Sequence, residues 1–229
     1  EQVHTDDTGW RVGGQPAQLM AFTTQTATVY QIRDRHRNQE VREVIPATYA
    51  GVLGCDRGKS YDAAALADVK QQKCVAHLQR SVSEVLATKW GRGRSFGLGL
   101  RRLLQEALAL WQGYHAGTAT DFAAQAAALQ ERFGTHLRQR LLPDPDNQRL
   151  LDQLRWHHER GNLLRFLSDP RIEPTNNRAE RALRPAVIAR KVSQCSKTQG
   201  GADAFAAFAS VLRTTAVSYT HLRAHETGR

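Results

Sequence analysis

The feature that most constrains the fold is a change in hydrophobic pattern about one third of the way along the chain. Up to residue 75, short runs rich in Thr, Val, Phe, Tyr and Ile are typical of β-strands. The predicted strands are residues 2–6, 18–24, 27–33, 51–55 and 72–75. From 78 to 167, apolar residues recur at helical spacing. Strands, then helices, then a mixed segment predict an α/β fold with an all-α insertion of about 90 residues.

Local sequence predicts where several of these elements end. Gln25-Thr26 is expected to form the turn between the second and third strands, and a helix over 38–45 should stop before Pro46. Gly91-Arg92-Gly93-Arg94 is expected to be a basic, flexible link. Near the C-terminus, Asn176 or Asn177 can cap a helix that Pro185 should limit.

The charge balance narrows the classes of partner. The chain has 229 residues, with 32 Lys and Arg against 22 Asp and Glu, which gives a formal net charge of +10. This excess suits nucleic acid or an anionic membrane surface. No apolar run approaches the roughly 18 residues that a membrane span needs. The three cysteines are an odd number and far apart, which favours a reducing, cytoplasmic environment over a disulfide framework.

Acidic residues stand out at three places. Asp6-Asp7 are at the end of the opening strand, and Asp56 comes directly after the apolar run 51–55. A carboxylate at the end of a buried strand lies at the rim of a sheet, where α/β proteins tend to place their sites. Glu180 is the third, and it is the acid within an arginine-rich segment.

Two interpretations of Glu180 are open. It could form an exposed pair with Arg184, which contributes roughly 0.3–0.5 kcal/mol to a helix. Alternatively, all three carboxylates could meet and hold a pair of Mg²⁺ ions about 4 Å apart, an arrangement that serves phosphodiester chemistry. Hard oxygen ligands suit Mg²⁺, and the neighbouring arginines would attract the DNA backbone.

Four ordered motifs carry a resemblance to a known family. They are residues 4–10 (HTDDTGW), 51–56 (GVLGCD) with Tyr61, 74–78 (CVAHL), and 176–185 (NNRAERALRP) followed by Arg190-Lys191 and residues 200–202 (GGA). Over residues 2–215 the chain resembles transposases of insertion-sequence family sixty-six, which are DDE-type recombinases with a ribonuclease-H-like core. The expected fold is a mixed sheet flanked by helices, with the all-α insertion before the last catalytic acid.

The resemblance implies roles for individual residues. Asp6, Asp56 and Glu180 would form the catalytic, metal-binding triad, holding two Mg²⁺ or Mn²⁺ ions, with His77 as an active-site neighbour. It also implies that the enzyme cleaves element ends and joins them to target DNA by in-line attack, working in the bacterial nucleoid as a homo-oligomer on DNA. The candidate phosphate contacts are Arg178, Arg181, Arg184, Arg190 and Lys191.

The chain departs from the family pattern at two positions near these acids. Asp7 stands where the family usually has Glu, so Asp7 is an alternative first ligand, and Asp6 is chosen by its position in the motif. Arg57 follows Asp56 where a smaller or aromatic residue is expected, and it could weaken the site or bind phosphate. Cys74 and His77 supply only half of a tetrahedral zinc site.

The domain organisation follows from these assignments. Residues 1–78 and 169–216 are expected to build the ribonuclease-H-like core, and 79–168 the helical insertion. Residues 217–229 resemble one translated frame of a sequencing adapter and are expected to be a non-native tail on a catalytic-core fragment. Two other functions stay open, a nuclease that only hydrolyses DNA and a basic DNA-binding protein without catalysis.

Overall fold

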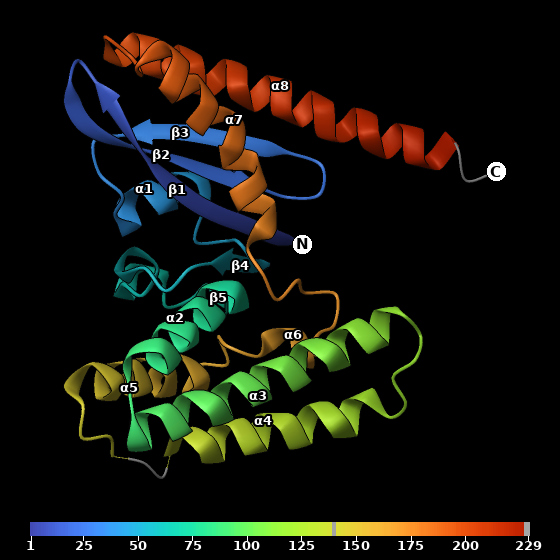
Figure 1. Cartoon of the computed structure of the whole chain (residues 1–229). Helices are drawn as coiled ribbons and strands as arrows, with labels where there is room; N and C mark the ends of the chain where they lie inside the picture. Colours follow the sequence, from blue (N-terminus) through green and yellow to red (C-terminus); the bar gives the residue numbers. More distant parts are fainter. Residues whose placement is uncertain (139–140, 227–229) are drawn as a thin grey trace. The chain divides into compact units, whose positions relative to one another are not determined.

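The computed structural model describes residues 1–138 and 141–226, and side chains up to residue 216. The chain forms two compact units (Figure 1). The first combines Glu1–Lys70 with the segment from Asn176 onward, and the second is Gln71–Thr175. The part of the chain that the structure describes contains no helix both long and apolar enough to cross a membrane.

A five-stranded mixed sheet is the centre of the fold, with strand order β3-β2-β1-β4-β5. Its strands are β1 (Gln2–Val12), β2 (Gln15–Thr23), β3 (Thr28–Arg33), β4 (Val52–Cys55) and β5 (Lys70–Lys73). The pairs β1–β2 and β2–β3 are antiparallel, whereas β4 runs parallel to β1. The expected α/β fold, a mixed sheet flanked by helices, is therefore confirmed.

Strand β1 is longer than predicted. It was expected to end at Asp6, but it continues to Val12 and turns into β2 through Gly13-Gly14. Both glycines have positive φ, 57° and 81°, as the two-residue hairpin turns that match strand twist require. The extension also buries Trp10, which is 3% exposed. The Gly-Gly pair was the missed sequence indication of this hairpin.

The two faces of the sheet carry separate apolar cores because side chains alternate along each strand. Helices α7 (Asn177–Ser193) and α8 (Gln199–Glu226) pack on one face. Helix α1 (Asn38–Val44) and the short helical turns Lys59–Tyr61 and Ala64–Leu66 pack on the other. The first core contains Trp10, Leu19, Ala21, Ile32, Leu183 and Ala186, and the second contains Met20, Phe22, Val41, Leu53, Cys55 and Tyr61.

Helix α8 covers the edge strand β3 (Figure 1). The backbone N–H of Thr28 donates to Thr214 Oγ1 at 3.0 Å, and that of Tyr30 donates to Ser210 Oγ at 2.8 Å. Unpaired edge groups invite pairing with another chain. Two hydroxyls of α8 therefore satisfy donors that would otherwise be exposed at this edge.

The prediction that Pro185 limits its helix was wrong. Helix α7 continues through Pro185 to Ser193. Proline removes one backbone hydrogen bond, but here its ring lies on the exposed side, while Ala182 and Ala186 on the other side are buried. Packing against the sheet therefore outweighs the lost bond.

The second unit contains the predicted all-α insertion. Its helices are α2 (Val75–Thr88), α3 (Gly91–His115), α4 (Phe122–Arg138), α5 (Pro145–Glu159) and α6 (Arg165–Ser168). The expected flexible link Gly91–Arg94 was wrong, because these residues form the first turn of α3. Gly93 is buried there against the Asn147 side chain, a contact that depends on the folded unit and not on local propensity.

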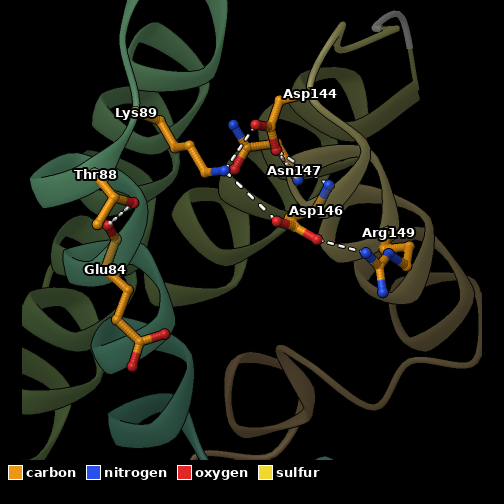
Figure 2. A network of polar contacts seen from close by, with 7 residues as sticks. All are labelled: Glu84, Thr88, Lys89, Asp144, Asp146, Asn147 and Arg149. Atoms are coloured by element: carbon orange, nitrogen blue, oxygen red, sulfur yellow. Dashed lines mark hydrogen bonds and ion pairs between the residues drawn. The ribbon is translucent and has the colours of Figure 1, made fainter.

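Polar contacts at the start of α5 connect this helix with the end of α2 in the second unit (Figure 2). The Asp144 carboxylate accepts from the backbone N–H groups of Asp146 and Asn147, each at 3.0 Å, which caps the helix. Lys89 donates to Asp144 at 2.7 Å from the residue that follows α2. The hydrogen bond from Lys89 lowers the pKa of the Asp144 carboxyl.

Candidate active site

The two neighbouring acids of β1 lie on opposite faces of the sheet. Asp6 pairs across the strands with Ala21, which belongs to the core beneath α7 and α8. Asp7 pairs with Met20, which belongs to the core on the other face. Directly opposed residues of antiparallel strands share a face. Asp6 is therefore on the side of α7, the helix that carries Glu180.

Asp56 follows β4 at the level of Asp6. The parallel register pairs Val3 with Leu53 and His4 with Gly54, and Asp56 is two residues beyond Gly54 as Asp6 is two residues beyond His4. Leu53 and Cys55 belong to the core opposite α7, and Asp56 is the first residue after this buried strand. Because β1 and β4 are neighbouring strands, their backbones are about 4.8 Å apart, the ordinary spacing in a sheet.

Glycine at position 54 is required by the packing of β4 against β1. A Cβ atom there would lie 3.0 Å from both His4 Nδ1 and Gln2 Nε2. His4 is only 2% exposed, so its ring has little room to move. Gly54 thus permits the close approach that brings the end of β4 beside Asp6.

Glu180 is in the first turn of α7, and a buried amide fixes that turn to β1. Asn176, 1% exposed, donates from Nδ2 to the carbonyl of Thr5 at 2.6 Å. The Glu180 N–H then donates to the Asn176 carbonyl at 3.1 Å, so Glu180 follows one helical turn later. The start of α7 is therefore attached to β1 at the residue before Asp6.

Burial and neighbouring charges together determine the pKa of Asp6. Burial, as the largest cause, raises the pKa of Asp6 to about 7 from its usual 3.8. The hydrogen bond from the Asp7 N–H, at 3.0 Å, lowers this pKa, whereas the negative charges of Asp7, Asp56 and Glu180 raise it further. The fold thus brings Asp56 and Glu180 close enough to repel the charge on Asp6.

The donor set fits a divalent cation by its chemistry. Carboxylate oxygens are the ligands that Mg²⁺ prefers, and a cation would relieve the repulsion that raises the pKa of Asp6. Within residues 1–138 and 141–226, no three His, Cys, Asp or Glu side chains are arranged so that they could bind one metal ion together. The charges of Asp56 and Glu180 act on Asp6, but the three side chains are not arranged in a metal-coordination geometry.

The basic residues of α7 divide into two kinds. Arg181, Arg184 and Lys191 are exposed, and Arg178 is half-buried. Arg190 instead donates to Thr8 Oγ1 at 3.2 Å and to the carbonyl of Gly9. Arg190 therefore has a structural contact with β1, while the exposed residues are available for phosphate.

His77, the expected active-site neighbour, is in the first turn of α2 in the second unit, three residues after the buried Cys74. The predicted tail 217–229 falls outside the described side chains, and 227–229 lie outside the described residues altogether.

Sequence reasoning missed His36, which contacts Asp7 with Nδ1 3.0 Å from Oδ1. It also missed Ser60, whose Oγ is 3.4 Å from His36 Nε2. The three residues are far apart in the sequence, and no motif among them gave an indication of the contact.

Comparison with known proteins places this arrangement in a family. Residues 1–204 match the family described as Transposase IS66 family. The chain belongs to the IS66 transposase family. Membership in the IS66 family makes DNA the partner on which this chain acts.

The chain was also compared with curated proteins and with solved structures. No curated protein matches the sequence of this IS66 family member. A solved structure that matches is "Structure of the HTLV-2 integrase catalytic core domain in complex with magnesium (trimeric form)". It is 9% identical, the match covers 65% of this chain and 91% of that chain, and the TM-score is 0.28.

Proposed function

We propose that this chain is the catalytic core of a DDE-type transposase, a polynucleotidyl transferase that cleaves DNA strands and joins them to a target. Asp6, Asp56 and Glu180 are the proposed metal-holding acids. The observation that carries the proposal is the hydrogen bond from Asn176 Nδ2 to the Thr5 carbonyl, which attaches the first turn of α7, with Glu180, at the residue before Asp6. The charges of Asp56 and Glu180, which add to the effect of burial in raising the pKa of Asp6, also support the proposal.

The acids have a common chemical task in this proposal. Mg²⁺ or Mn²⁺, as two ions, would activate the attacking oxygen and stabilise the leaving oxygen. Asp6 and Asp56 would hold the ions from adjacent strands, and Glu180 from the first turn of α7. The buried surroundings of Asp6 would exclude competing water, which strengthens its attraction for a cation.

The exposed arginines of α7 would bind the DNA backbone near these acids. Arg184 is exposed within the same helix as Glu180, and Arg181 is adjacent to Glu180 in the sequence. Phosphate contacts of this kind position DNA without reading its sequence. The proposal includes assembly of more than one copy on DNA, so that two element ends can be joined to one target.

Strand cleavage and strand transfer test the proposal. Asp56→Asn and Glu180→Gln should abolish Mg²⁺-dependent cleavage of DNA, and both variants should keep the fold. Asp203→Asn is the matched control, because Asp203 is an exposed acid on α8 of the same unit. Retained cleavage in either site variant would refute the roles given to these acids.

A pre-cut DNA end distinguishes transposition from simple hydrolysis. A transposase core should join the 3′-hydroxyl of such an end to a second DNA molecule. Cleavage without any joined product would identify a hydrolysis-only nuclease. DNA binding without cleavage, unaffected by Mg²⁺ or by the Asp6 and Glu180 substitutions, would identify a non-catalytic binding protein.

A further inference from the structure

A chain of contacts connects Asp7 with the segment that follows Asp56. His36 Nδ1 is 3.0 Å from Asp7 Oδ1, and His36 Nε2 is 3.4 Å from Ser60 Oγ. The His36 ring also stands edge-on to the Tyr61 ring, with centroids 5.2 Å apart. All of these groups belong to the first unit, on the sheet face opposite α7.

Gly58 connects the Asp56 carboxylate with the turn that contains Ser60. The Gly58 N–H donates to Asp56 Oδ1 at 2.8 Å. A Cβ atom built on Gly58 would lie 2.9 Å from Asp56 Oδ1 and 3.6 Å from Ser60 Oγ. A side chain at position 58 would therefore push against the carboxylate, and the Gly58 N–H holds that carboxylate against the turn that contains Ser60.

Tyr61 ties the same turn to β1. Its ring is 1% exposed, and its hydroxyl is 3.4 Å from Thr5 Oγ1. Thr5 precedes Asp6, and its carbonyl accepts the hydrogen bond from Asn176. Contacts from the Asp56 turn therefore reach the strand that carries Asp6 by way of Tyr61 as well as His36.

We propose that His36, oriented by Asp7, is a positioning residue that fixes the turn after Asp56 through Ser60 and so directs the Asp56 carboxylate. This inference rests on the proposed function, since it assigns Asp56 a metal. It also gives Asp7 a role distinct from that of Asp6: Asp7 orients a histidine, and Asp6 holds the cation. Partners that orient a metal ligand typically change affinity by about 10- to 100-fold when they are removed.

The test measures binding of Mn²⁺ alone to the full chain, by the paramagnetic resonance signal of the free ion. His36→Ala and Ser60→Ala should each weaken Mn²⁺ binding about 10-fold with little change in thermal midpoint. Ser60→Thr keeps the hydroxyl and should restore most of the affinity. Arg35→Ala is the matched control, because Arg35 is exposed and adjacent to His36. Unchanged affinity in both His36→Ala and Ser60→Ala would overturn the proposal.

Two substitutions of Asp7 separate positioning from ligation. Asp7→Asn keeps an oxygen that accepts from the His36 Nδ1–H, so affinity should stay within about 3-fold of the wild type, whereas Asp7→Ala should match His36→Ala. Equal, complete loss of Mn²⁺ binding in Asp7→Asn and Asp7→Ala would show that Asp7 is a ligand and overturn the positioning role.

A second readout does not depend on a metal. Hydrogen exchange of the Gly58 amide, which donates to Asp56, should accelerate in His36→Ala and Ser60→Ala and stay unchanged in Arg35→Ala. If the wild type bound no Mn²⁺ and cleaved no DNA, the proposed function would fail, and Gly58 exchange would still decide whether His36 fixes the turn. Unchanged Gly58 exchange in His36→Ala would reject that role.

Discussion

Asp6 and Asp7 are consecutive on β1, yet Asp6 faces α7 and Asp7 contacts His36 on the other side of the sheet. The family motif favours Asp6 as the first metal ligand and leaves Asp7 as an alternative. The alternation of the strand separates them, because only Asp6 shares a face with the helix that carries Glu180. The two acids should therefore respond differently to substitution.

The first prediction concerns stability against pH. The folded chain holds a proton on Asp6 up to about pH 7, whereas the unfolded chain releases it near 3.8. Between these values the folded state binds more protons, so the Asp6 contribution to the free energy of unfolding falls as pH rises, by up to ~1.4 kcal/mol per pH unit. Asp6→Asn does not titrate, and its stability relative to the wild type should rise over this range.

Urea unfolding across this pH range, without divalent ions, measures the effect. Asp203→Asn is the control, because Asp203 is exposed on α8. Parallel stability curves for the wild type and Asp6→Asn would show that Asp6 carries no raised pKa in the folded chain.

The second prediction concerns Mg²⁺. The ion competes with the proton on Asp6, so Mg²⁺ should stabilise the folded chain more above pH 7 than below it. A free concentration ~100-fold above Kd adds about 3 kcal/mol to the free energy of unfolding. Thermal melts with and without Mg²⁺, at pH values on either side of 7, check this. An equal shift at both pH values, or the same shift in Asp6→Asn, would contradict it.

The third prediction concerns the amide that fixes α7. Asn176→Ala leaves the buried Thr5 carbonyl without the Asn176 hydrogen bond, which should lower the free energy of unfolding by about 1–3 kcal/mol. Cleavage should fall as well, because the first turn of α7 would lose its attachment beside Asp6. Asn177→Ala, at the next and exposed position, is the matched control. Equal effects of the two substitutions on urea unfolding would exclude a special role for Asn176.

The fourth prediction separates two arginines of α7. Arg184 is exposed, so Arg184→Ala should weaken DNA binding with little change in stability, and it should reduce the slope of log affinity against log salt by about 1. Arg190 donates to Thr8 and Gly9, so Arg190→Ala should mainly lower stability. Anisotropy titrations over a salt series, paired with thermal melts, distinguish these effects. Reversed behaviour would reassign the two residues.

Much of the architecture follows from local sequence. The apolar run before Asp56 and the β-branched residues of 27–33 correctly predicted strands, and helical spacing predicted the insertion. The errors arose where tertiary packing overrides local preference. Gly91–Arg94 becomes helical against Asn147, and α7 passes Pro185 because its opposite side is buried.

Position in the sequence drew attention to the candidate acids, and the resemblance to a family assigned them a common role. Their proximity depends on three long-range features, namely the β1–β4 register, the Asn176–Thr5 bond and the strand alternation that separates Asp6 from Asp7. No local pattern predicts such contacts. His36 and Ser60 were missed for the same reason, since their partners become neighbours only after folding.

The bond between Asn176 and Thr5 also marks where the chain re-enters its first unit after the helical segment Gln71–Thr175. Because this re-entry point is anchored to the sheet itself, the spacing between Asp6 and Glu180 does not depend on the length of the intervening segment. We therefore expect changes in the length of the α2–α6 segment to leave Glu180 in place beside Asp6.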